Sequence, residues 1–102
     1  MSKERQMFKA KLKTWTVVGA PGVLIPERLH HGIEAYAFDH QQPGSFLMAV
    51  FMNDLKAAVG RADPDCIGAL PALSGFLRFE MPMGSSGSRE IVSKWLNRAP
   101  NR

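Results

Sequence analysis

Histidines and a carboxylate gather in one stretch of the chain and raise the question of a metal site. His30 and His31 are adjacent, and Glu34 stands one helical turn beyond His30. Adjacent histidines on a helix point about 100° apart, and no second ligand pair in the sequence has the spacing of a zinc site. We therefore predict no metal and no cofactor, and we expect the two histidines to face solvent or a partner.

Two other patterns typical of enzymes are incomplete. The single cysteine, Cys66, cannot form an intramolecular disulfide and has no catalytic base near it in the sequence, so we interpret it as a small core residue. The turn at 19–22, Gly-Ala-Pro-Gly, lacks the Gly-Lys-Ser/Thr sequence of a phosphate-binding loop. Since no Ser-His-Asp, Cys-His or paired-carboxylate arrangement is present either, we predict that the protein is not an enzyme.

Conspicuous polar residues lie in or beside the most apolar stretch of the chain, residues 44–61. Apolar side chains cover most of a helical wheel drawn for this stretch, which predicts one central, buried helix. Asp54 and Arg61 lie on one stripe of that wheel with small residues between them. A buried carboxylate needs a hydrogen-bonding or charged partner, so we favour a structural role for Asp54. The alternative is a partner-binding surface made by Asn53, Asp54, Arg61 and Asp63.

The net charge of +4 is confined to the first thirteen residues, which carry five basic side chains and one acidic one. From Phe8 onward apolar residues alternate with lysines, a period-two pattern that predicts a strand with one solvated face. A helix over residues 2–13 is the second interpretation. An arm with this charge could neutralise phosphates and stack a base. The alternative function is therefore nucleic-acid binding through Lys9, Lys11, Lys13 and Trp15.

Start and stop signals divide the rest of the chain into helices. A helix is expected from 26 to 38, a further one is capped by Asp63, and Ser88 caps the last. Pro71 should kink or split the helix that follows Asp63. We predict a mainly α fold, a compact bundle of about four helices, one of them kinked at proline, with an extended or β N-terminal arm. The expected divisions are a basic arm (1–22), a helical domain (23–98) and a tail (99–102).

The composition is that of a folded domain, with 45% apolar and 22% charged residues among 102. A chain of this length buries only about 60–65% of its extended surface, so a homodimer stays open as a way to bury more. No apolar run approaches the roughly 18 residues of a membrane span or the core of a secretory signal. We expect a cytoplasmic protein that does not contact membranes.

Several motifs follow one another between residues 25 and 96: Ile-Pro at the start, then PGSFLMAV, NDL and RAD between 43 and 63, and a final GSRE before Trp95. This order resembles a widespread family of small uncharacterised proteins of bacteriophages, prophages and other mobile elements. Two features depart from the family pattern, because residues 1–22 lie outside it and Arg89 stands where the pattern usually has proline. The resemblance implies a habitat and no known reaction.

We therefore expect a small accessory protein of the phage or mobile-element type that binds a macromolecular partner, foremost a protein, and modulates host or defence machinery. A short chain cannot bury all of its apolar surface, and methionine adapts well to varied contacts. The methionines that could contribute to such a surface are Met48, Met52, Met81 and Met83.

Overall fold

The chain folds into short helices in the computed structural model, which describes residues 2–16 and 22–98. The helices in these residues are α1 (Lys3–Thr14), the 3-10 helix η1 (Glu27–Leu29), α2 (His30–Asp39), α3 (Ser45–Phe51), α4 (Leu55–Arg61), α5 (Pro64–Gly68), α6 (Leu70–Phe79) and α7 (Arg89–Leu96). No strand occurs in the part of the chain that the structure describes. The prediction of a mainly α fold is confirmed.

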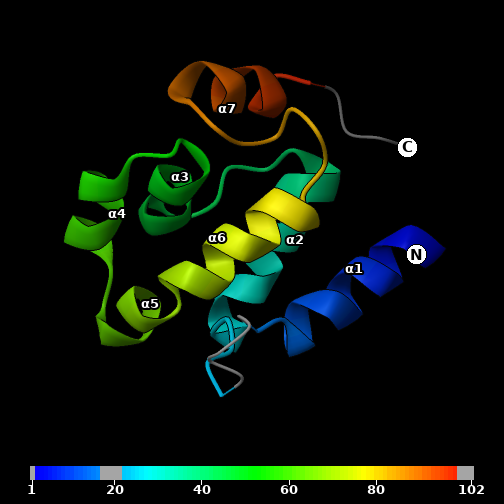
Figure 1. Cartoon of the computed structure of the whole chain (residues 1–102). Helices are drawn as coiled ribbons and strands as arrows, with labels where there is room; N and C mark the ends of the chain where they lie inside the picture. The colour runs from blue at the N-terminus through cyan, green and yellow to red at the C-terminus, as the bar shows by residue number, and fades with distance from the viewer. Residues whose placement is uncertain (1, 17–21, 99–102) are drawn as a thin grey trace.

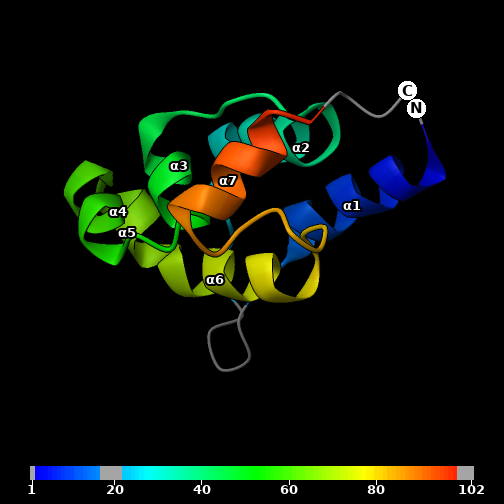
Figure 2. The same ribbon diagram turned by 90° about the horizontal axis from the view of Figure 1, so that it is seen from above.

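Helices α2 and α6 lie at the centre of the molecule, with α1 on one side of them and α3 and α4 on the other (Figure 1). Helix α7 lies at the top of the molecule in Figure 1, and the view from above shows it between α3 and α6 (Figure 2). The side chains of Tyr36, Phe51, Phe76 and Val92 come from four different helices and are fully buried. The Tyr36 and Phe51 rings stack with centroids 4.3 Å apart, and the Trp95 indole N–H donates to the Tyr36 carbonyl at 2.7 Å. The centre of the core thus joins α2, α3 and α7.

The N-terminal arm is a helix, so the predicted strand is wrong and the second interpretation holds. Ser2 caps α1 by accepting a hydrogen bond from the Arg5 backbone N–H at 3.1 Å. Phe8 and Leu12, one turn apart, are buried against the core, whereas Ala10 is exposed. Long unbranched side chains, which dominate this segment, lose little freedom in a helix. Residues 17–21 and 99–102, and with them most of the predicted turn and the whole predicted tail, lie outside the described residues.

Arg5 fastens α1 to α2 through two carboxylates. Its guanidinium donates two parallel hydrogen bonds to the Asp39 carboxylate, at 2.9 and 2.8 Å, and a further one from Nε to Glu34. Glu34 is 8% exposed, and a charge buried to that extent requires such a partner. The basic arm is therefore bound to the helical body by charge as well as by its apolar face.

Acidification is expected to weaken this contact. The hydrogen bonds from Arg5 hold the pKa of Asp39 below its ordinary value. A carboxyl group whose folded pKa is lowered stabilises the protein above its unfolded pKa, about 3.9, and loses that effect as pH falls through the folded value. In urea unfolding measured over a pH series, the free energy of unfolding should fall below about pH 4. The fall should be shallower in Asp39→Asn and unchanged in Glu27→Gln, an exposed control. Equal pH dependence in all three proteins would contradict the assignment.

The predicted single helix at 44–61 is wrong, because the chain reverses between α3 and α4. Asn53 adopts the left-handed conformation, with φ 60°, which asparagine tolerates better than most residues. The Asp54 N–H then donates to the Ala49 carbonyl at 2.9 Å, and the Asp54 carboxylate caps α4 by accepting from the Ala57 N–H at 3.1 Å. The two short helices pack side by side instead of continuing along one axis.

The helical region after Asp63 is also divided into two helices, as the sequence predicts from Pro71. Asp63 caps α5 by accepting from the Cys66 N–H at 2.9 Å. The division falls at Ala69, and Pro71 stands in the first turn of α6, where its missing N–H costs no helical hydrogen bond. Ser88 caps α7 as predicted. The helix count exceeds the predicted four because the stretches 44–61 and 64–79 each form two helices and the arm adds another.

Candidate functional site

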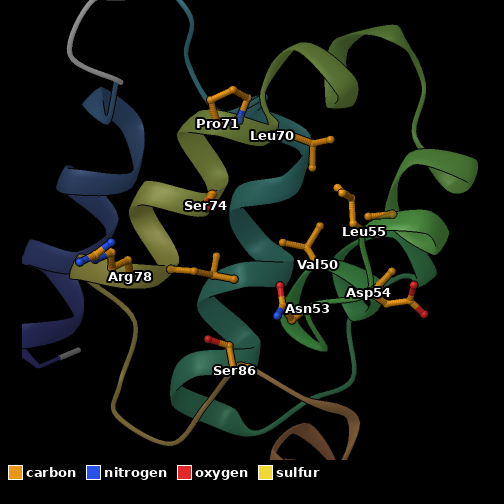
Figure 3. A pocket seen from close by; sticks show the side chains of 13 residues that line it. Val50, Asn53, Asp54, Leu55, Leu70, Pro71, Ser74, Arg78 and Ser86 are labelled. Atoms are coloured by element: carbon orange, nitrogen blue, oxygen red, sulfur yellow. The ribbon is translucent and has the colours of Figure 1, made fainter.

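A groove of about 460 Å³ lies between α6 and the α3–α4 pair and is the candidate site (Figure 3). The loop before α7 closes one end. The residues that line the groove are Ala49, Val50, Asn53, Asp54, Leu55, Ala58, Leu70, Pro71, Ser74, Leu77, Arg78, Ser86 and Gly87. The volume is that of a site for a small ligand or for a few side chains of a partner.

The groove is apolar along its length. Ala49 and Ala58 are buried in it, and their small side chains leave the space that a larger residue would fill. Leu70 and Leu77 come from one face of α6, while Leu55 at the start of α4 is 69% exposed. A leucine this exposed, beside further apolar lining, is surface that the chain does not bury on its own.

Charged groups stand on both sides of the groove. Arg78 belongs to α6, and its guanidinium points away from the groove; Asp54 belongs to the opposite wall, and its carboxylate also points outward (Figure 3). Among the described residues no carboxylate lies within 4.0 Å of the Arg78 guanidinium, which instead lies 5.4 Å from the centroid of the neighbouring Phe79 ring. One oxygen of Asp54 caps α4. The charged ends of both side chains thus lie outside the groove, whose interior is apolar.

The loop that closes the groove is held in place, although its Gly-Ser composition is typical of a flexible segment. The Gly87 N–H donates to the Phe51 carbonyl at 2.7 Å. Ser85 is fully buried, and its carbonyl accepts the Tyr36 hydroxyl proton at 2.5 Å. Burial raises the pKa of Tyr36, which keeps the hydroxyl protonated and able to donate. Gly84 and Gly87 take positive φ values that favour glycine. The position of Ser86 is therefore fixed relative to α3.

Two of the four residues predicted to bind a partner line the groove, and two do not. Asn53 and Asp54 are in the lining. Arg61 lies elsewhere and donates to the Ser45 carbonyl at 3.4 Å, so no contact with Asp54 is formed. Asp63 caps α5 and pairs with Arg28; the hydrogen bond from the Cys66 N–H is the main cause that lowers the pKa of Asp63. The predicted set is not brought together into one site.

The sequence interpretation missed the contribution of α6, chiefly Leu77 and Arg78, and that of Leu55. Nothing in the sequence places α6 opposite the NDL motif, because that is decided by tertiary packing. The methionines do not line the groove: Met48 and Met52 are half-buried against the core, and Met83 is 97% exposed outside it.

The residues predicted to bind nucleic acid are partly engaged within the protein. Lys9 lies 3.8 Å from the Glu34 carboxylate and Lys11 lies 3.0 Å from that of Glu80. Trp15 packs edge-on against Phe76, with ring centroids 5.5 Å apart. For Lys13 no ion pair is formed with any described residue. The arm therefore offers fewer uncommitted cations than its composition indicates.

The cysteine and two of the three histidines also have structural neighbours. Cys66 is buried, and burial is the main cause that raises the pKa of its thiol, which disfavours the reactive thiolate. A ring nitrogen of His30 lies 2.9 Å from the Ile25 carbonyl, and one of His40 lies 2.8 Å from the Trp95 carbonyl. Exposed His31 stands apart from these contacts.

Comparison of the chain with protein-family models, with curated proteins and with solved structures finds no match. The resemblance to mobile-element proteins thus stays a prediction. Within the described residues, no helix has both the length and the apolar character needed to cross a membrane. The functional argument accordingly depends on the geometry of the groove.

Proposed function

We propose that this protein is a small accessory protein that acts by binding another protein through the groove between α6 and the α3–α4 pair. The observation that carries the proposal is the apolar groove with Leu55 exposed at its side. Concave apolar surface with a few polar groups is the usual setting for recognition. A role on a phage or other mobile element, in modulating host or defence machinery, is supported by the resemblance of residues 25–96 alone.

The chemistry of the lining supports binding over catalysis. The lining contains one carboxylate, one guanidinium, one amide and two hydroxyls, and neither cysteine nor histidine. Catalysis by a nucleophile would need a hydroxyl paired with a base, and among the described residues neither serine hydroxyl of the lining is hydrogen-bonded to the Asp54 carboxylate, which caps α4. The amide and hydroxyl groups can instead orient a bound segment by hydrogen bonds.

Site-specific photo-crosslinking tests the proposal. A photoreactive amino acid replaces Leu55 in the groove or, as a matched control, Lys94, which is exposed on α7 outside the lining. In nuclease-treated bacterial lysate, the Leu55 position should give a discrete protein adduct that the Lys94 position does not give. A second substitution, Ala58→Glu, would place a carboxylate in the groove and should remove the adduct. Adducts that are the same at both positions would refute a groove-specific partner.

Nucleic-acid binding through the arm is the alternative, and the pairings of Lys9 and Lys11 weigh against it. The same experiment separates the two functions. Replacing Lys9, Lys11 and Lys13 by glutamine should leave the Leu55 adduct intact. A salt-sensitive gel shift of the wild-type protein with DNA or RNA that this triple variant abolishes would favour the alternative.

A further inference from the structure

We infer that Tyr36, a residue of α2 outside the groove lining, is a positioning residue for the end wall of the groove, which is made by Ser86 and Gly87. Its hydroxyl keeps the loop at 82–88 closed and thereby keeps the end wall in the lining. Where it concerns binding, this inference rests on the proposed function, because it names what controls one end of the same site. The position of the loop itself can be tested without a partner.

The Tyr36 hydroxyl is held in place by contacts with three helices. The Tyr36 side chain is fully buried, and its ring stacks on that of Phe51 in α3 with the two planes 16° apart. Its backbone carbonyl accepts the hydrogen bond from the Trp95 indole of α7 at 2.7 Å. Because both its ring and its backbone are fixed, the residue presents its hydroxyl to one acceptor, the Ser85 carbonyl.

Two hydrogen bonds among the described residues join the loop to α2 and α3, one on each side of Ser86. The Ser85 carbonyl accepts from the Tyr36 hydroxyl at 2.5 Å. The Gly87 N–H donates to the Phe51 carbonyl at 2.7 Å. Ser86, between them, lies at one end of the groove (Figure 3). Its position therefore depends on both bonds.

The rest of the loop is weakly attached. The Ser85 N–H and hydroxyl both donate to the Pro82 carbonyl, at 3.2 and 2.6 Å, so these hydrogen bonds stay within the loop. Met83 is 97% exposed and adds no apolar anchor. Gly84 and Gly87 have positive φ and no side chain, so the backbone can turn at both ends of the segment between them. Lifting this segment therefore needs no change in a helix.

Removing the hydroxyl should open the loop. In Tyr36→Phe the ring and its stacking on Phe51 remain, but the buried Ser85 carbonyl loses its donor. A buried carbonyl without a partner is unfavourable, so it is expected to turn toward water. It reaches water only if the loop lifts, and Ser86 moves with it. Contacts of a bound segment at Ser86 then depend on Tyr36, whereas contacts at Leu55, at the start of α4, do not.

Amide hydrogen exchange, followed by NMR on the full chain, tests the position of the loop. In Tyr36→Phe the Gly87 N–H should exchange about tenfold faster or more, the change that corresponds to one lost hydrogen bond, while amides inside α4 keep their rates. Asp63→Ala is the matched control, because it also removes one hydrogen bond, at the N-cap of α5, outside the loop and the groove lining. Gly87 should exchange at the wild-type rate in this control. An unchanged Gly87 rate in Tyr36→Phe, or the same increase in the control, would overturn the inference.

Photo-crosslinking tests the effect on binding, with the photoreactive amino acid at Ser86 or at Leu55, both in the lining. Tyr36→Phe should lower the yield of the protein adduct at Ser86 severalfold and leave that at Leu55 nearly unchanged. A residue that acts only through overall stability would lower both yields alike, and that result would refute the positioning role. An adduct at Leu55 with none at Ser86 in the otherwise unchanged chain would refute a part for the end wall in binding. If neither position gives an adduct, the proposed function fails, and the Gly87 exchange rate still decides whether Tyr36 holds the loop.

Discussion

Leu12→Ala is expected to lower the free energy of unfolding by about 2–4 kcal/mol, the usual cost of removing a buried leucine side chain. Leu12 is 1% exposed and belongs to the same core cluster as Phe76 and Ile33. Its removal leaves a cavity between α1 and the rest of the protein. For a domain of about 100 residues, the loss should lower the melting temperature by roughly 10 °C or more. Chemical and thermal unfolding followed by circular dichroism measure both quantities.

Ala10→Gln is the matched control for this variant. In the helix Ala10 is exposed, and glutamine is nearly as good a helix former as alanine, so the change should cost less than about 0.5–1 kcal/mol. In the strand that the alternating pattern predicts, Ala10 would share the buried face with Phe8 and Leu12, and a buried glutamine would be strongly destabilising. A large effect at Ala10 together with a small one at Leu12 would contradict the docking of α1.

The same residues explain why the sequence did not determine the structure of the arm. Phe8 and Leu12 are four positions apart, a spacing that places two side chains on one face of a helix and also on one face of a strand. The two patterns differ at Ala10, which is exposed in the helix and would be buried in the strand. Alanine is tolerated at both kinds of position, so it does not decide between them. The contacts that decide the matter, from Arg5 to Glu34 and Asp39, join segments that no local pattern brings together.

Local signals predicted other parts of the fold well. Asp63 and Ser88 cap helices because each side chain accepts a hydrogen bond from a backbone N–H three residues later. A similar local signal is present at Asn53 and Asp54. Asparagine tolerates the left-handed conformation, and the aspartate that follows it is a good N-cap. The continuous apolar pattern of 44–61 outweighed that signal in the sequence interpretation. A wheel drawn through the whole stretch combines two helices with different axes, so it cannot place their side chains.

Only one wall of the candidate site could be predicted from the sequence. Asn53 and Asp54 stand out in the sequence because they interrupt an apolar stretch, and both line the groove. The other wall comes from α6, more than fifteen residues further along the chain. Because Leu77 lies on the apolar face of an amphipathic helix, the sequence predicts that it belongs to the core. The sequence cannot tell which apolar positions of such a helix are left partly uncovered by their neighbours. That depends on how α6 crosses α3 and α4.

Asp54→Ala is expected to cost about 0.5–2 kcal/mol of stability, because the helix α4 loses its N-cap and the Ala57 N–H loses its acceptor. The side chain of Asn can still accept that hydrogen bond, so Asp54→Asn should retain most of the stability while removing the negative charge. Urea unfolding of the two variants measures both changes in stability. Equal destabilisation by Ala and Asn would show that charge, not capping, makes Asp54 stabilising. Near-wild-type stability of Asp54→Ala would show that the turn between α3 and α4 is held without the cap.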